Sequence, residues 1–208
     1  MAVTLISRLG TASALGADMT LRHLSLIGVI AVGVMSAPVV RAQTGAETFT
    51  ATATVKTGGG ATATAPVRIV VDRMMPQAEA EKYAAAFRKG GAAEFRKALA
   101  GVKPTGSVTL GTGKTTPTRI TFERRTDKGR LITIVTDAPI LFLGAGAPGA
   151  KPKEGYDFAV IDIEVSDQGR GSGVMSPAAK IGLKDTAFVV SDYSIELVQL
   201  KDVTKVVK

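Results

Sequence analysis

Threonine and apolar side chains alternate over residues 47–57, and this period of two constrains the fold more than any other feature of the chain. Phe49, Ala51, Ala53 and Val55 fall on one face, and Thr48, Thr50, Thr52 and Thr54 fall on the other. Side chains alternate between the two faces of a β-strand, so the pattern predicts a strand with one buried face. A glycine run follows, and the alternation resumes over residues 61–71, which predicts a hairpin. Pro66 in the second run favours an edge strand, because proline cannot donate a ladder hydrogen bond.

Six more segments show β-branched richness or the same alternation. They are residues 107–110, 118–125, 130–136, 158–165, 171–175 and 194–203. Asp-Lys-Gly at 127–129 and Asp-Gln-Gly at 167–169 are typical of tight turns between neighbouring strands. Short strands separated by such turns favour antiparallel pairing. We therefore predict a mainly β (α+β) fold, in the form of an antiparallel β-sandwich or sheet.

A helical hairpin is expected over residues 76–100, inserted between strands. Pro76 suits the first position of a helix, and Glu79 follows in the first turn, where the helix dipole favours acidic groups. Gly90-Gly91 is expected to end this helix, and Gly101 to end a second, shorter one. Tyr83, Phe87, Phe95 and Leu99 recur at helical spacing. We interpret this stripe as packing against the sheet.

An export signal is expected at the start of the chain. Residues 24–34 are mostly apolar and follow Arg22-His23, and Val40-Arg41-Ala42 matches the small-x-small pattern of a cleavage site. The apolar run is shorter than the roughly 20 residues of a spanning helix, so cleavage after Ala42 is favoured over a retained membrane anchor. We expect residues 1–42, which include an extension upstream of the signal, to be removed. Residues 43–208 then form the exported protein, periplasmic or extracellular.

The exported chain has neither imidazole nor thiol groups. His23 is the single histidine and lies in the segment expected to be removed, and the sequence contains no cysteine. Ser-His-Asp and Cys-His catalysis are therefore excluded, as are disulfides and metal sites built from histidine or thiolate ligands. We expect no cofactor and no metal ion.

Length and charge are those of one mildly basic domain. Removal of residues 1–42 leaves 166 residues (208 less 42), enough for one β-rich domain. The formal net charge falls from +8 to +6, because the removed segment carries three arginines and one aspartate.

Two glycine-rich motifs resemble nucleotide-binding loops but lack their context. Residues 111–115, Gly-Thr-Gly-Lys-Thr, end like a phosphate-binding loop, yet Val108 stands where that loop needs glycine, and a strand is expected next instead of a helix. Residues 144–149 match G-x-G-x-x-G, yet Pro148 and Pro152 prevent the helix that the dinucleotide fingerprint requires. We interpret both motifs as loops between strands.

Carboxylates are the remaining source of acid–base chemistry, and Asp162 and Glu164 are the candidate pair. They occupy alternate positions of a predicted strand, so both point to one face with their carboxyl groups roughly 6–7 Å apart. This separation suits a glycosidase pair, which needs roughly 5–9.5 Å. A solvated strand face explains the same pattern, and it is the favoured interpretation because Ile161, Ile163 and Val165 alternate with the two acids.

Basic residues define a possible anion-binding surface. Its candidates are Arg124, Arg125, Lys151 and Lys153, and Lys201, Lys205 and Lys208 add to the positive charge. We expect a weak attraction to acidic envelope polymers. Aromatic side chains do not interleave with these cations, so specific nucleic-acid binding is not predicted.

The C-terminal half resembles a family of uncharacterised exported bacterial proteins. The likeness covers residues 74–203 and is carried by five short segments. They are Thr-Asp-Ala-Pro-Ile-Leu-Phe at 136–142, Tyr-Asp-Phe at 156–158, Ile-Asp-Ile at 161–163, Gly-Ser-Gly at 171–173 and Ser-Pro-Ala-Ala-Lys-Ile at 176–181. The resemblance implies export and a single domain, and it brings no activity, substrate or catalytic residue.

Three classes of function remain, and the first is favoured. The leading hypothesis is a non-enzymatic binding or envelope-associated module, whose partners are envelope polymers or another protein and which meets the membrane only through its signal segment. The first alternative is a glycan hydrolase that uses Asp162 and Glu164. The second is a structural or assembly subunit with an exposed strand edge at residues 48–55, where the guarding charges of a protected edge are missing.

Overall fold

The structure is a computed structural model that describes residues 45–56, 60, 62–140, 154–184, 187–193 and 197–207. These residues belong to one compact unit. The predicted signal segment, Lys151, Lys153, Lys208 and the 144–149 motif lie outside them.

The described chain contains nine strands and one helix. In chain order they are β1 (Glu47–Lys56), β2 (Thr62–Val71), α1 (Gln77–Ala100), β3 (Gly106–Leu110), β4 (Thr116–Thr126), β5 (Gly129–Thr136), β6 (Phe158–Val165), β7 (Arg170–Lys184), β8 (Ala187–Tyr193) and β9 (Val198–Val206). The protein is therefore β-rich, as the sequence predicts.

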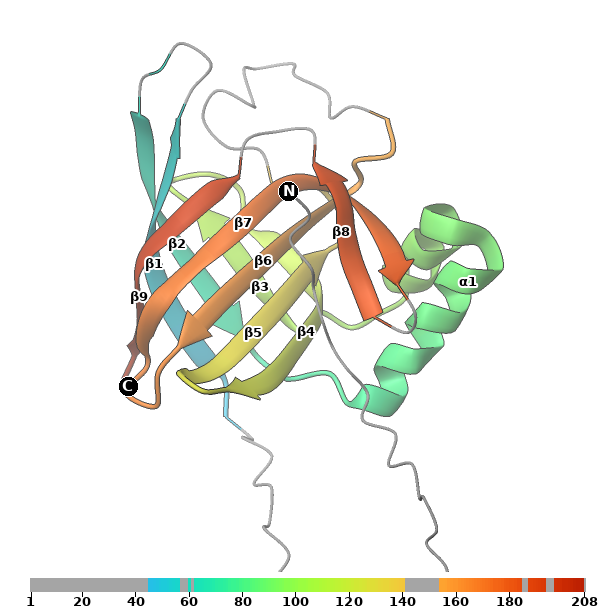
Figure 1. The fold of residues 1–208 in the computed structure, drawn as a ribbon, viewed down its shortest axis with the longest axis horizontal. Helices are drawn as coiled ribbons and strands as arrows, with labels where there is room; N and C mark the ends of the chain where they lie inside the picture. The colour runs from blue at the N-terminus through green and yellow to red at the C-terminus, as the bar shows by residue number, and fades with distance from the viewer. Residues whose placement is uncertain are drawn as a thin grey trace, which may run out of the picture. The chain divides into compact units, whose positions relative to one another are not determined.

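The sheet closes into a barrel, which corrects the predicted sandwich or open sheet. Strand pairs are antiparallel, and neighbours follow the order β6-β5-β4-β3-β2-β1-β9-β7-β8. An additional β6–β7 pairing joins the two ends, so eight strands, β1 to β7 and β9, form a ring, and β8 extends from β7 outside it (Figure 1). The prediction was wrong because one-sided alternation is common to sandwiches and barrels, and only long-range register separates them.

Apolar side chains fill the interior of the barrel. The largest are Phe49, Ile69, Ile132, Ile134, Ile161, Ile163, Met175 and Leu200, each at most 1% exposed. The predicted alternation of β1 is confirmed, because Phe49, Ala51, Ala53 and Val55 are all buried. A ring of eight strands is narrow enough for side chains alone to occupy it.

Glycines allow the ring to close between β6 and β7. Gly171 pairs with Val165, and Gly173 pairs with Ile163. A Cβ at Gly171 would lie 1.8 Å from the carbonyl oxygen of Glu164, and one at Gly173 would lie 2.4 Å from that of Asp162. A side chain at either position would push the strands apart, so closure depends on the Gly-Ser-Gly sequence at 171–173.

β1 and β2 are interior strands of the ring. β1 pairs with β2 along its whole length and with β9 from Thr48 to Thr54, so the edge considered for assembly at residues 48–55 is not free. Pro66 also lies in an interior strand and not at the predicted edge. Its carbonyl oxygen accepts a hydrogen bond from the Gly111 N–H at 2.7 Å, and β3 ends at Leu110, opposite Val67. The missing N–H of Pro66 therefore faces a place where the neighbouring strand has already ended.

The predicted helical hairpin is a single kinked helix. α1 begins at Gln77, one residue after the expected start at Pro76, which is its N-cap, and Gly101 follows its last residue as expected. Two helical stretches meet at a kink at Gly90 and Gly91, where the sequence predicts the first helix to end. These two residues have non-helical backbone angles, and Gly91 has φ of 64°, a conformation that glycine adopts without strain. The break therefore lies where the sequence predicts it, but the two stretches form one kinked element, α1, in place of a hairpin.

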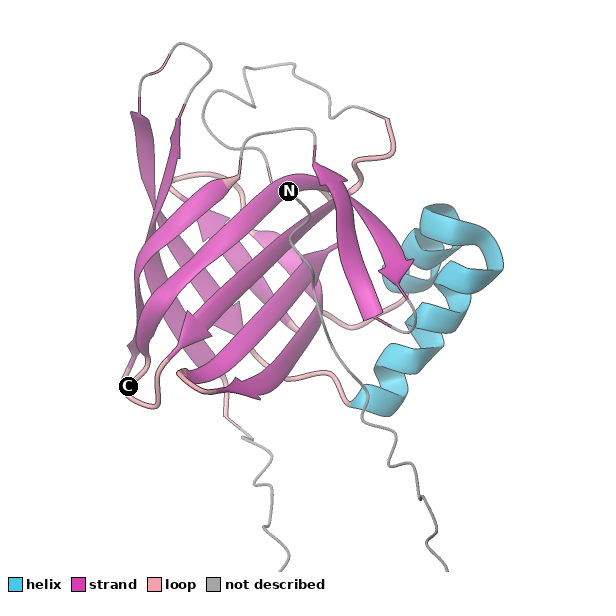
Figure 2. Cartoon of the chain, in the orientation of Figure 1, coloured by secondary structure: helices cyan, strands magenta, loops and turns pink. Residues whose placement is uncertain are grey.

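A second core lies outside the barrel, between α1 and the outer surface of the strands. Phe95 and Leu99 of α1 are fully buried together with Ile120, Phe158 and Val160 from the barrel wall. The ring centroid of Phe95 lies 5.4 Å from that of Phe158 and 5.8 Å from that of Phe87. Figure 2 shows α1 beside the end of β7. The predicted aromatic stripe is thus packed against the sheet, as expected.

The strand predictions end too early in the region of β7 and β8. β7 runs eleven residues beyond Gly173, to Lys184, and its second half pairs with β8, which the sequence interpretation missed. This strand also contains Pro177, which lies at a register shift between β6 and β7, where the ladder is already interrupted. β8 has β7 as its one strand neighbour among the described residues.

Candidate functional site

Two hairpins meet at one end of the barrel and line a shallow, open polar cleft. The cleft has a volume of about 380 Å³, and its lining comes from the β4–β5 and β6–β7 turns. The lining residues are Arg125, Thr126, Asp127, Lys128, Gly129, Ser166, Asp167 and Gln168. Apart from the glycine, their side chains carry charged, hydroxyl or amide groups, so the cleft suits a polar ligand.

The turns that form the cleft are those predicted from the sequence. Thr126 pairs with Gly129 across the first turn, and the Gly169 N–H donates to the Ser166 carbonyl at 2.8 Å in the second. Gly129 has φ of 136°, and a Cβ there would lie 2.3 Å from the Val165 carbonyl oxygen. Glycine at this position therefore lets the first hairpin approach the start of the second turn.

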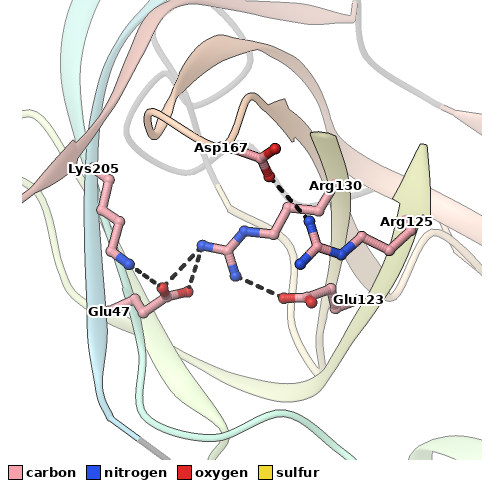
Figure 3. Close-up of polar contacts among 6 residues, drawn as sticks. All are labelled: Glu47, Glu123, Arg125, Arg130, Asp167 and Lys205. Carbon is pink, nitrogen blue, oxygen red and sulfur yellow. Dashed lines mark hydrogen bonds and ion pairs between the residues drawn. The ribbon is translucent and has the colours of Figure 1, made fainter. Parts of the chain in front are cut away.

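An ion pair joins the two hairpins across the cleft. Arg125 Nη1 lies 3.0 Å from Asp167 Oδ1, and the two side chains are 75% and 83% exposed (Figure 3). Water and salt screen a pair at this exposure, so it contributes at most about 1 kcal/mol to stability. The pair can exchange for another partner at small cost.

A second set of charges lies at the same end of the barrel, and we call it the ion cluster: Glu47, Glu123, Arg130 and Lys205. Glu47 and Arg130 are buried, whereas Glu123 and Lys205 lie nearer the surface, with 27% and 31% of their side chains exposed. Arg130 Nη2 is 2.9 Å from both carboxylate oxygens of Glu47, and Arg130 Nη1 is 2.7 Å from Glu123 Oε2. Lys205 Nζ lies 2.5 Å from Glu47 Oε1 (Figure 3). Arg130 also lies over the ring of Phe49, 5.9 Å from its centroid. The cluster therefore connects β1, β4, β5 and β9.

The electrostatics of the ion cluster favour its charged form. Burial alone would raise the pKa of Glu47, but hydrogen bonds from Arg130 and Lys205, together with their charges, lower that pKa below its ordinary value. Burial alone would lower the pKa of Arg130, but the carboxylates of Glu47 and Glu123 raise it. Both residues remain ionised at neutral pH, at 5% and 8% exposure. The ion pairs of the cluster therefore hold four strands together at one end of the barrel.

The ion cluster was missed from the sequence, although it left a signal there. Glu47 falls on the same face as Phe49 and Ala51, and Arg130 falls on the same face as Ile132 and Ile134. A charge at an inward position of an alternating strand indicates a buried partner. Glu47 and Arg130 have opposite charges at inward positions, so a contact between them could have been predicted from this pattern.

A pH titration of stability should reveal the ion cluster. At pH 7 the wild type is expected to have a larger free energy of unfolding than Glu47→Gln, and the difference between the two proteins should be at its maximum there. The folded pKa of Glu47 is lowered, so this excess is present above the unfolded pKa and is lost as the pH falls through the folded value. Urea denaturation of both proteins between neutral pH and about pH 3 measures it.

Asp162→Asn is the control for this titration, because its stability relative to the wild type should change with pH in the opposite direction. Burial raises the pKa of Asp162 in the folded state, so the ionised wild-type side chain carries a penalty at pH 7 that disappears as the pH falls. Asp162→Asn should therefore lose its advantage over the wild type on acidification. Parallel curves for both variants would contradict the two assignments.

Asp162 and Glu164 lie on the face of β6 opposite its core residues, as the sequence predicts, but both are half-buried and not fully solvated. Ile161, Ile163 and Val165 point inward and are fully buried. Asp162 accepts a hydrogen bond of 2.5 Å from Thr133 Oγ1. Burial raises the pKa of Asp162, against the lowering effect of this hydrogen bond and of the Arg124 charge. Neither acid contributes to the cleft between the hairpins.

The predicted anion-binding surface is described only in part. Arg124 and Arg125 are both exposed at adjacent positions of β4. Arg125 lines the cleft, whereas the charge of Arg124 acts on Asp162 of the outer wall. Lys151 and Lys153 fall outside the described residues. The cleft therefore takes one of the four candidates and adds Lys128, which the sequence interpretation did not select.

Residues 111–115, which resemble the end of a phosphate-binding loop, form a turn between strands, as the sequence predicts. These residues connect β3 to β4, with φ of 58° at Gly111, and the next element is a strand. The Gly113 N–H donates to the Leu110 carbonyl at 2.9 Å. No helix begins here whose amides could hold a phosphate.

The described part of the chain holds no group of three or more His, Cys, Asp or Glu side chains placed to bind a metal ion. Among the same residues, none of the helical structure is both long and apolar enough to cross a membrane. No family model, curated protein or solved structure matches the chain.

Proposed function

We propose that the protein is an exported, non-enzymatic binding module of the bacterial envelope. The predicted signal segment at residues 1–42 motivates export. One structural observation carries the binding part: the barrel interior is occupied by its own side chains, so a ligand must meet the outer surface. On that surface, the cleft between the two hairpins is a concave, polar site.

The charges near the cleft support binding more than catalysis. Glu47, Arg130 and Lys205 are occupied with one another in the ion cluster. Arg125 and Asp167 are paired but exposed, so they can contact a ligand without the loss of a buried interaction. A surface of this kind suits weak, reversible attachment to a polar envelope polymer.

The hydrolase alternative rests on a different observation. Burial raises the pKa of Asp162, which is a property of general acids in glycosidases. Glu164 lies two positions away on the same face of β6. The alternative is weaker because Thr133 is hydrogen-bonded to Asp162 and because neither acid lines the cleft.

Sedimentation and hydrolysis assays distinguish the two functions. The purified protein is expected to co-sediment with insoluble peptidoglycan or with acidic polysaccharide beads, and to release no reducing sugar from them. Asp162→Asn and Glu164→Gln should sediment as the wild type does.

Two results would reject the proposed function. One is the release of reducing sugar by the wild type that is lost in Asp162→Asn, which would establish the hydrolase. The other is the absence of co-sedimentation with every envelope polymer at low salt, where an electrostatic attraction is strongest.

A further inference from the structure

We infer that the cleft between the β4–β5 and β6–β7 turns binds a single sugar unit that carries an anionic group, either a carboxylate or a phosphate. The inference rests on the proposed function and names the chemistry of its ligand. It concerns the cleft alone, so it can fail while attachment to the envelope through another surface remains.

The cleft is held in shape before any ligand arrives. Gly129 brings the first turn against the backbone of Val165 and Ser166. Arg130, the next residue along the chain, is fixed by Glu47 and Glu123, and the Lys205 N–H donates to the Gly169 carbonyl at 2.7 Å behind the second turn. A preorganised site loses less conformational entropy when a ligand binds.

The lining matches a hydroxyl-rich ligand of small size. Arg125 and Lys128 donate hydrogen bonds, Asp127 and Asp167 accept them, and Gln168 does both. A volume of about 380 Å³ is at the small end of ligand sites. The lining lacks large apolar side chains, so an acyl chain or aromatic ligand would leave these polar groups without partners.

Basic residues flank the cleft on both hairpins. The lining itself is balanced, with Arg125 and Lys128 against Asp127 and Asp167, and the exposed Arg124 and Arg170, next to the lining in the chain, make the two hairpin ends positive overall. Arg125 is paired with the Asp167 carboxylate at 3.0 Å. Because that pair is exposed, a ligand carboxylate or phosphate can replace Asp167 and form a charge-assisted contact with the guanidinium.

Thr126 has an unsatisfied hydroxyl group beside the cleft. Its Oγ1 is buried and has no hydrogen-bond partner among the described residues, and Thr126 is part of the cleft lining. A buried hydroxyl without a partner is destabilising. Rotation of the Thr126 side chain toward a bound sugar would give this hydroxyl a partner without opening the turns.

The test is an NMR titration of the purified, isotopically labelled protein with glucuronate, glucose 6-phosphate and glucose. We expect glucuronate or glucose 6-phosphate to shift the amide signals of residues 125–129 and 166–169, with a dissociation constant on the order of 1 mM. The stronger of the two anions identifies the group that is recognised. Glucose should bind roughly tenfold more weakly or more, because it lacks the charge-assisted contact.

Matched charge variants locate the site. Arg125→Gln combined with Lys128→Gln should weaken binding of the anionic sugar by roughly tenfold or more. Arg68→Gln combined with Lys56→Gln removes the same charge from exposed positions on β2 and β1 and should change affinity by less than about twofold. Equal losses in the two double variants would show attraction to net charge only.

The inference is overturned if neither anionic sugar shifts the hairpin signals, if glucose binds as well as its anionic counterparts, or if the shifts lie elsewhere on the barrel. The first and third results leave co-sedimentation with envelope polymers unaffected. Failure of this inference is therefore distinguishable from failure of the proposed function.

Discussion

Replacing Arg130 with alanine is expected to lower the free energy of unfolding by about 3–5 kcal/mol. The substitution leaves the carboxylate of Glu47, which is 5% exposed, with Lys205 alone, and it removes the partner of Glu123. A buried charge that loses its main partner carries a desolvation cost that the remaining partner compensates only in part. Urea denaturation at pH 7, followed by circular dichroism, measures the change.

Arg125→Ala is the matched control for Arg130→Ala. It removes the same side chain from a neighbouring position, but its partner Asp167 is 83% exposed, so the expected loss is below about 1 kcal/mol. Equal small losses in both variants would show that the ion cluster does not stabilise the barrel. A large loss in Arg125→Ala would show that the hairpin pair is far stronger than its exposure implies.

Phe95→Ala is expected to cost about 3–5 kcal/mol, because it removes a fully buried ring from the second core. The ring contacts Phe158 of the barrel wall and Phe87 of α1, and its removal leaves a cavity between the helix and the strands. Thermal or urea denaturation measures the loss.

Phe87→Ala is the control within the same helix. Phe87 is partly exposed, so its truncation should cost clearly less than that of Phe95. Hydrogen exchange adds a second readout: the amides of α1 should lose more protection in Phe95→Ala than those of β1 and β2. A loss of protection that is uniform over the whole chain would indicate that helix and barrel unfold together.

Much of the secondary structure follows from the sequence, because its causes are local. Strand alternation depends on neighbouring residues. The turns at 127–129 and 167–169 depend on three consecutive residues, an aspartate first and a glycine last. The burial of Phe95 and Leu99 follows from helical spacing. Pro177 shows the limit of such rules, because a register shift in the sheet makes room for it inside a strand.

Closure of the barrel could not be predicted, because its causes are long-range. The pairing of β6 with β7 looks like any hairpin in the sequence, and the pairing of β1 with β9 joins the two ends of the described chain. Gly171 and Gly173 are required for close strand approach, but a glycine in a strand can equally mark a bulge or a tight bend. A sandwich and a barrel therefore remain equivalent until these registers are known.

The candidate site was predictable in its parts and not in its assembly. Both turns and Arg125 were identified from the sequence, but nothing in the order of residues places Asp127 near Asp167. Asp162 and Glu164 attracted attention because they alternate with core residues, and the structure puts them on the wall of the barrel instead of in the cleft. The β4–β5 and β6–β7 turns lie close together because β5 pairs with β6 in the closed sheet.

The pairing of β1 with β9 also determines when this protein can fold. Thr48 is a direct neighbour of Val206, so the first strand lacks one of its two partners until the last strand is present. A chain that emerges from the ribosome with its N-terminus first must therefore complete β9 before the ring can close. Closure of the ring is thus a late event, whatever the order in which the hairpins form.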